Sequence, residues 1–201
     1  MSVITEGEAR IAETINSSQI AGSVSLIQQE IADTAGAIEA KQLAALAVGV
    51  AAAPRIFLAG AGRSGLVLRM AAMRLMHLGL TVHVAGDTTT PAITSGDLLL
   101  VASGSGTTSG VVKAAKTASG AGAKVAVLTT NAQSPLAVLA DTLVIIPAVQ
   151  KTDHGSSVSR QYSGSLFEQA LFLATEAVFQ SLWETADVSA EELWLRHANL
   201  E

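Results

Sequence analysis

The chain has 201 residues and a formal net charge of −5, and 49% of its residues are hydrophobic, 14% charged and 3% aromatic. Because it contains no cysteine, the sequence excludes disulfides, thiolate metal sites and cysteine nucleophiles. The acidic balance argues against nucleic acid as a partner, and the longest nearly uncharged stretch, 42–54, is shorter than the ~20 residues of a membrane-spanning helix. We therefore expect a cytoplasmic protein that binds neither nucleic acid nor a membrane.

The first part of the chain, residues 1–52, predicts two helices. Its apolar residues recur at helical spacing, as in Ile20, Val24, Ile27 and Ile31. Gly36 separates the two helices, and Pro54 ends the second. We assign residues 1–20 to an N-terminal tail or helix and residues 21–201 to a single domain.

From residue 55 onward, short apolar runs alternate with helical segments. The runs that read as buried strands are 56–59, 81–85, 97–102, 124–128 and 142–146. The helical segments are 64–77, 107–120, 134–140, 165–184 and a last helix from Ser189. This alternation predicts an α/β fold, a three-layer αβα sandwich with a five-stranded parallel sheet of flavodoxin-like or Rossmann-like type and the N-terminal helices packed on it.

Two of the predicted helices are apolar on all sides, at 66–78 and 166–183. A helix of this kind is buried on more than one face. A second subunit is the simplest cover for these helices, so we expect a homo-oligomer. The alternative, burial under the N-terminal helices, can account for one of the two.

A glycine-rich loop, 60–65, follows the first strand and opens a helix. Its sequence, GAGRSG, matches the dinucleotide fingerprint G-x-G-x-x-G, and Asp87 follows the second strand, where an acid would bind a ribose. Glycines let backbone N–H groups approach a ligand, and Ser64 adds a hydroxyl. The alternative is a turn whose glycines serve only close packing of strand and helix.

A second loop, after the third strand, is rich in both glycine and hydroxyl groups: Ser103, Gly104, Ser105, Gly106, Thr107 and Thr108. Hydroxyls and N–H groups at a helix N-terminus predict a phosphate-binding site. A nicotinamide dehydrogenase needs one such loop rather than two, and the absence of G-K-[ST] excludes a P-loop nucleotidase. The alternative is a serine-rich turn that caps the helix.

Glu168 is the candidate for a general base. It lies among apolar residues at the start of a predicted helix, where partial burial favours such a role. The alternative is structural, because Ser165 and Glu168 have the spacing of a capping box. The same spacing recurs at Ser189 and Glu192, where we interpret it as purely structural.

The spacing of the four histidines matches no metal motif: His77, His83, His154 and His197. At the end of an apolar helix, His77 is typical of a capping or satisfied side chain, and His83 is typical of a strand residue. The long polar loop 148–163 places His154 where it can reach a ligand, and His197 lies near the C-terminus. The histidine pattern therefore predicts no metal site.

Six motifs in this order carry a resemblance: AGAGRSGLV, AMRLMHLGL, GDTTTPAI, SGSGTTSG, GSLFEQ and RHANLE. From about residue 20 to its end the chain resembles the 6-phospho-3-hexuloisomerase family of the sugar isomerase (SIS) domain superfamily. The resemblance implies an SIS-type fold and interconversion of D-arabino-hex-3-ulose 6-phosphate and D-fructose 6-phosphate through an enediol. This reaction is a step of formaldehyde fixation in the ribulose monophosphate pathway and needs no cofactor.

The resemblance also assigns residues and partners. It places substrate binding on Ser64 and the loop 103–108, the proton acceptor on Glu168, and the active sites of a homotetramer across its subunits. As the donor to the enediolate we expect loop N–H groups or a histidine, His197 of a neighbouring subunit or His77. A 3-hexulose-6-phosphate synthase is the implied functional partner. Many relatives have a charged residue where this chain has Thr107, so a role for a charged side chain at that position is in doubt.

Three alternatives remain open from the sequence. The first is a non-catalytic module that binds phosphosugars, and the second is another aldose–ketose phosphosugar isomerase. A nicotinamide dehydrogenase is the third. The acidic chain without an appended DNA-binding domain disfavours the first of these.

Overall fold

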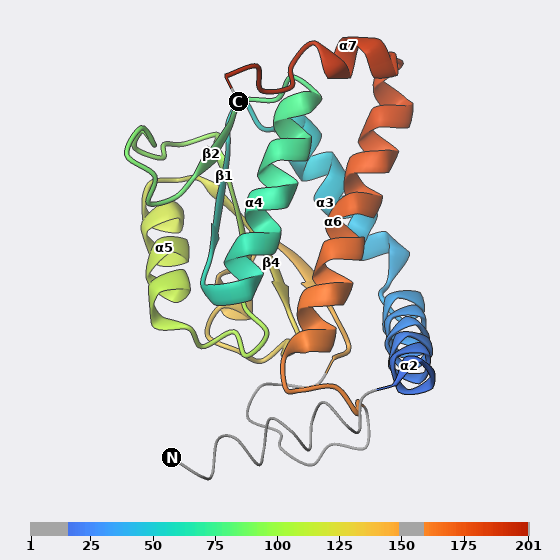
Figure 1. Ribbon diagram of the computed structural model, residues 1–201. Helices are drawn as coiled ribbons and strands as arrows, with labels where there is room; N and C mark the ends of the chain where they lie inside the picture. The colour runs from blue at the N-terminus through green and yellow to red at the C-terminus, as the bar shows by residue number, and fades with distance from the viewer. Residues whose placement is uncertain (1–15, 149–158, 201) are drawn as a thin grey trace, which may run out of the picture.

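The computed structural model describes residues 16–148 and 159–200 (Figure 1). Within them, five strands form one parallel sheet in the order β2-β1-β3-β4-β5. The strands are β1 (Ile56–Gly60), β2 (Val82–Val84), β3 (Leu98–Ala102), β4 (Lys124–Thr129) and β5 (Thr142–Ile145). The five predicted strands are thus confirmed, with ends that differ by at most one residue.

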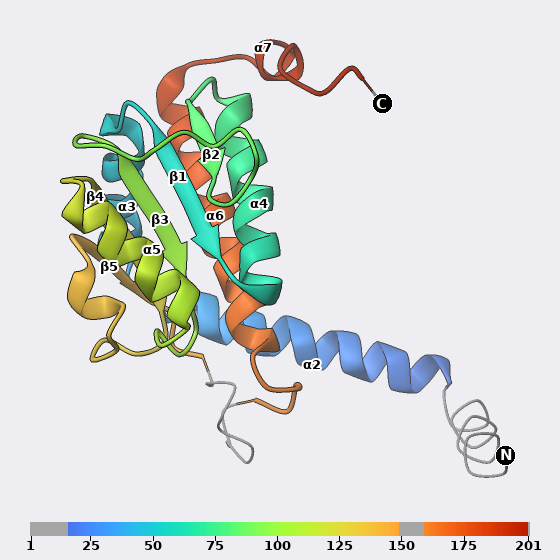
Figure 2. The same cartoon turned by 90° about the vertical axis from the view of Figure 1, so that its left-hand side faces the viewer.

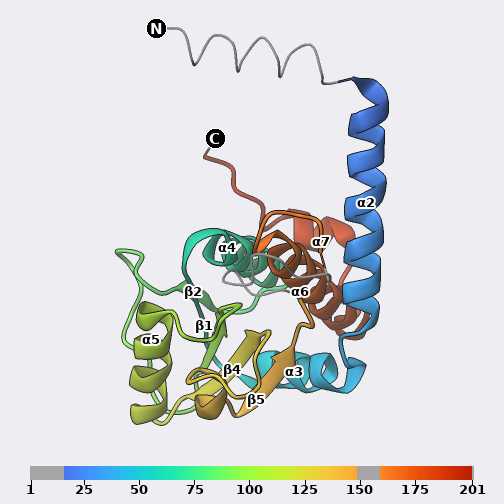
Figure 3. The same cartoon turned by 90° about the horizontal axis from the view of Figure 1, so that it is seen from below.

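The helices occupy both faces of this sheet. They are α2 (Ser17–Gly36), α3 (Ala40–Ala52), α4 (Gly62–His77), α5 (Ser109–Gly120), α6 (Ser165–Ala186) and α7 (Ala190–Trp194), with a 3₁₀ turn, η1 (Ala137–Leu139). Figure 3 shows α3, α4 and α6 on one face and α5 on the other. The predicted three-layer αβα sandwich is therefore confirmed, and only the short helix predicted at 134–140 shrinks to η1.

Alternate residues of each central strand enter two separate cores. On β1, Ile56 and Leu58 join the core beneath α3, α4 and α6, whereas Phe57 joins the core beneath α5. Small side chains on α5, Ala115 and Ala118, are fully buried against the sheet. The aliphatic, aromatic-poor composition thus serves close helix–sheet packing on both faces.

The two N-terminal helices have different neighbours. Helix α3 packs against β5 and α6, and Gln42 Oε1 accepts a hydrogen bond from the Ile145 N–H at 2.7 Å. Helix α2 contacts α6, buries only Thr34, and extends away from the rest of the molecule (Figure 2). In the described part of the chain no single helix is long and apolar enough to cross a membrane; α2 and α3 reach that length only together, across a bend of 77°.

Candidate active site

The two glycine loops lie next to each other at the carboxyl edge of the sheet. Strands β1 and β3 are neighbours, and Gly60 pairs with Ala102 at their ends. The chain leaves β1 toward α4 on one face and β3 toward α5 on the other (Figure 1). In open parallel sheets this divergence of two crossovers is where ligands bind.

The first loop brings strand and helix into unusually close contact. A Cβ atom on Gly65 would lie 2.6 Å from the carbonyl oxygen of Gly60, so neither position tolerates a side chain without a backbone shift. These two glycines therefore serve packing, as the alternative interpretation expected. Between them, Ser64 is buried in the first turn of α4, and Arg63 is exposed.

Hydrogen bonds within the second loop fix its shape. The hydroxyls of Ser103 and Thr108 lie 2.9 Å apart, and the Gly106 N–H donates to Ser103 Oγ at 3.2 Å. Thr107 Oγ1 donates to Ser105 Oγ at 2.9 Å. Thr108, the N-cap residue of α5, makes no side-chain capping bond, so the interpretation of this loop as a helix-capping turn is wrong.

Residues at the end of β4 and just after it hold the same loop from outside. The Gly104 carbonyl accepts hydrogen bonds from the hydroxyls of Thr129 and Thr130 at 3.1 and 2.8 Å. Gly106 has a φ of +65°, and a Cβ atom there would collide with Ser134. These supporting residues were not identified from the sequence; the run of hydroxyl residues after the fourth strand is the signal that indicates them.

Helix α6 brings Glu168 to these loops. The Phe167 ring packs against Gly104, and Glu168, 3% exposed, pairs with Arg63 of the first loop at 2.6 Å between Oε2 and Nε. The predicted capping box at Ser165 is wrong, because α6 is capped by Gly164 and has no side-chain capping bond. The capping box at Ser189 and Glu192 is confirmed, with bonds of 3.0 and 3.2 Å.

A polar network holds the segment that leads into α6. Glu30 of α2 accepts hydrogen bonds from Ser159 Oγ, the Arg160 N–H and Gln161 Nε2. Burial raises the pKa of Glu30, but these hydrogen bonds outweigh it and the pKa is lowered. Gln161 Oε1 in turn accepts a bond from Gln169 at 2.8 Å, so the network reaches the residue beside Glu168.

The histidines lie elsewhere in the chain. His77 and His197 stack with ring centroids 4.0 Å apart at the C-terminal end of α4, about 20 Å of helix away from Arg63. Within one chain, the structure therefore does not bring His197 to Glu168. Burial lowers the pKa of His77, as do the charges of His197 and Arg74.

The other two histidines are His83, in β2, and His154, in the loop 148–163. His83 lies in β2 beside Phe57, with ring centroids 5.0 Å apart, as a strand residue does. His154 lies outside the described residues, as does most of the loop 148–163. Among the residues described, no group of three His, Asp or Glu side chains is placed to hold a metal ion.

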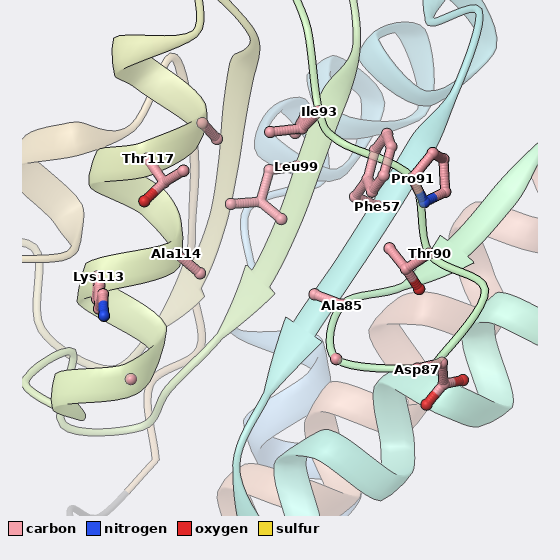
Figure 4. A pocket seen from close by; sticks show the side chains of 13 residues that line it. Phe57, Ala85, Asp87, Thr90, Pro91, Ile93, Leu99, Lys113, Ala114 and Thr117 are labelled. Atoms are coloured by element: carbon pink, nitrogen blue, oxygen red, sulfur yellow. The ribbon is translucent and has the colours of Figure 1, made fainter.

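Two hollows border this part of the molecule. One, of about 460 Å³, lies beside the Arg63–Glu168 pair and is otherwise lined mainly by apolar residues of α4 and α6, among them Leu66, Met70 and Leu173. The other, of about 430 Å³, lies between α5 and the segment after β2, with Phe57 and Leu99 at its apolar floor (Figure 4). Neither glycine loop lines the second hollow, so it is separate from the candidate site.

Asp87, which stands where the dinucleotide fingerprint would have a ribose-binding acid, borders that second hollow (Figure 4). Its carboxylate pairs with Arg69 of α4 at 2.6 Å. This ion pair ties the segment after β2 to α4 and gives Asp87 a structural partner in place of a ribose.

Known proteins share both the sequence and the fold. The family model of the SIS domain matches residues 50–173. The chain is 68% identical to the 3-hexulose-6-phosphate isomerase of Mycobacterium gastri, over 96% of this chain and 98% of the relative. It is 38% identical to the Bacillus subtilis protein of the same name, over 89% and 97%. A Methanococcus jannaschii protein of known crystal structure, for which a 3-hexulose-6-phosphate isomerase function was inferred, superimposes with a TM-score of 0.77 at 26% identity, covering 90% of this chain and 99% of that one.

Proposed function

The chain belongs to the SIS domain family, and on that premise we propose that it is an isomerase interconverting D-arabino-hex-3-ulose 6-phosphate and D-fructose 6-phosphate. The identity to curated 3-hexulose-6-phosphate isomerases extends over nearly the whole chain. The observation that carries the chemistry is the position of Glu168, a buried carboxylate at the edge of two glycine loops. The reaction is a step of formaldehyde fixation by the ribulose monophosphate pathway.

The loop 103–108 binds the phosphate of the substrate. Its hydroxyls are already ordered by hydrogen bonds with one another, and no side chain caps the N-terminus of α5 behind it. The N–H groups of that first turn, together with the helix dipole, attract an anion. Ser64 adds a hydroxyl from the neighbouring loop, on the opposite side of the divergence between β1 and β3.

Glu168 transfers the proton. The carbonyl moves between C2 and C3 through an enediol, and one base can take the proton from one carbon and return it to the other. A carboxylate serves this role only when the substrate lies within about 3 Å and water is excluded. Burial of Glu168 in the first turn of α6, beside the loop that binds the phosphate, supports this assignment.

A second subunit completes the site. Leu66, Met70 and Met73 form an apolar stripe on α4, with 62%, 45% and 52% of each residue exposed. The stripe adjoins the hollow beside Glu168. We infer that another copy of the chain covers it, within a homotetramer.

The geometry of α4 supports contributions across this interface. Met70 lies midway between Arg63 and His77, about 10 Å along the helix from each. A two-fold axis near Met70 would therefore bring the far end of the partner's α4, with the stacked His77 and His197, to Arg63 and Glu168. One of these two histidines of the partner then donates a hydrogen bond to the enediolate. Because both histidines lie far from Glu168 within their own chain, this contact forms only across the interface.

A coupled assay tests the function. Formaldehyde and ribulose 5-phosphate are supplied with a 3-hexulose-6-phosphate synthase, the proposed functional partner in the cytoplasm, and fructose 6-phosphate is measured. Formation of fructose 6-phosphate that depends on this chain is the expected result. Binding of fructose 6-phosphate without turnover would indicate a phosphosugar-binding module, and turnover of an aldose phosphate in its place would indicate another isomerase.

A further inference from the structure

Arg63 is placed differently from the other arginines of α4. Its side chain is 63% exposed, yet its Nε lies 2.6 Å from a carboxylate that is 3% exposed. Arg69, six residues along the same helix, also pairs with a carboxylate at 2.6 Å, but there both partners are exposed, at 53% and 44%. The Arg63 guanidinium therefore lies at the boundary between the buried Glu168 and open space.

The atoms used in this ion pair leave the guanidinium able to bind a ligand as well. A guanidinium has five N–H donors in a planar fork, and Nε is the one nearest the chain. Nε is the nitrogen that lies 2.6 Å from Glu168 Oε2, and the Arg63 side chain as a whole is 63% exposed. The ion pair through Nε thus leaves the two Nη groups as donors for the oxygen of a substrate carbon that lies within reach of Glu168.

We propose that Arg63 is a catalytic residue that orients Glu168 through Nε and donates through its Nη groups to the enediolate oxygens of the substrate. The inference rests on the proposed isomerase function and adds to it a donor from the same chain. It assigns to a residue of the first glycine loop a role other than phosphate binding.

The charges balance along the reaction. From fructose 6-phosphate, the C3 proton passes to the Glu168 carboxylate, the C3–H electron pair forms the C2–C3 double bond, and the C2 carbonyl electrons move to its oxygen. Glu168 becomes neutral as the enediolate becomes negative, so Arg63 keeps one anionic neighbour throughout. Glu168 then returns the proton to C2, while the C3 hydroxyl loses its proton to the C2 oxygen and the C3 carbonyl forms.

The experiment compares Arg63→Ala and Arg63→Lys with Arg69→Ala as the matched control. We expect Arg63→Ala to lower kcat by ~10²–10³-fold, with a much smaller change in KM, because the phosphate is held by another loop. Guanidinium chloride at non-denaturing concentrations should restore part of that kcat, since the position is open to solvent, whereas potassium chloride and urea should not. Arg63→Lys keeps the charge but loses the fork and should also lose kcat.

A second measurement follows the enediol itself. In deuterium oxide, incorporation of deuterium at C3 of fructose 6-phosphate should fall in Arg63→Ala in parallel with kcat. Wild-type kcat in Arg63→Lys, or a raised KM with unchanged kcat in Arg63→Ala, would overturn the proposal. Lost activity with a lowered Tm and no response to guanidinium would also overturn it, because the ion pair would then be only structural. An inactive wild-type protein would instead refute the isomerase function.

Discussion

The carboxylate of Glu30, on α2, accepts a hydrogen bond of 2.8 Å from the backbone N–H of Arg160. The two residues are 130 positions apart in the chain, and Arg160 lies in the segment that leads into α6. The helix that extends from the molecule thus fixes the entry to the helix that carries Glu168. This contact links the N-terminal region to the geometry of the candidate site.

Glu30→Ala is therefore expected to lower both stability and activity. Loss of hydrogen bonds to a charged acceptor should reduce the free energy of unfolding by about 2 kcal/mol, and kcat should fall because α6 no longer starts from a fixed segment. Urea denaturation and steady-state kinetics measure the two effects. Gln29→Ala, on the same helix, removes only a bond to Asp33 and serves as the control. Equal activity of the two variants would contradict this role of Glu30.

Glu168→Gln tests the general base directly. Glutamine keeps the size of the side chain but cannot accept the proton, so kcat should fall by ~10²–10⁴-fold while circular dichroism stays unchanged. Glu192→Gln is the matched control, because Glu192 has the same Ser-x-x-Glu spacing and forms a true capping box. It should keep full activity with a slightly lowered Tm. Full turnover in Glu168→Gln would remove Glu168 from the mechanism.

The sequence predicts the fold well because the three central strands, β1, β3 and β4, are mostly buried apolar runs bounded by glycine, proline or polar residues. A strand such as Leu98–Ala102 is buried along its whole length, which is the pattern of a parallel sheet covered on both faces. The end of α2 at Gly36 also follows from local chemistry. The 3₁₀ turn at 137–139 does not, because tertiary contacts override the weak helical preference of so short a segment.

The site is predicted only in its local parts. The two glycine loops carry their own signal, whereas the ion pair of Arg63 and Glu168 joins residues that only the folded chain brings together. Ser165 and Glu168 have capping-box spacing, but the left-handed Gly164 caps α6 and Glu168 turns toward Arg63. Thr129 ends the next strand and Thr130 follows it, and their hydroxyls were missed for the same reason.

Gly106→Ala should damage the phosphate loop. The new Cβ would collide with Ser134, and a φ of +65° is strained for alanine, so the loop must shift. We expect a loss of more than about 1 kcal/mol of stability and a raised KM for the phosphosugar. Gly120→Ala, in open space at the end of α5, is the control and should not change KM. Thermal unfolding measures the stability, and substrate titration measures KM. Equal stability and equal KM in the two variants would contradict the prediction.

A charge on the α4 stripe should prevent assembly. Met73→Glu places a carboxylate within the proposed contact, where burial without a partner is unfavourable. We expect sedimentation to show smaller species. We also expect kcat to fall, because a second subunit no longer completes the site. Val138→Glu, at an exposed position of η1 on the other face of the sheet, is the control. An unchanged oligomer in Met73→Glu would place the interface elsewhere.

The stacked histidines should make stability depend on pH. In the folded chain the pKa of His77 is lowered, chiefly by burial and further by the charges of His197 and Arg74. The unfolded chain restores the usual value of about 6.5, so between the lowered value and about 6.5 the unfolded state binds more protons. The free energy of unfolding should therefore fall as pH drops through this window, and the contribution of His77 is complete above it.

Two variants of His197 separate burial from charge. His197→Phe keeps a ring over His77, and because burial is the main cause, most of the decline in Tm with falling pH should remain. His197→Ala uncovers His77, so its pKa should return toward the usual value and the decline should flatten. Both variants lack the imidazole of His197, so the difference between their Tm profiles reports His77 alone. Identical profiles would mean that the C-terminal segment does not bury His77 in solution.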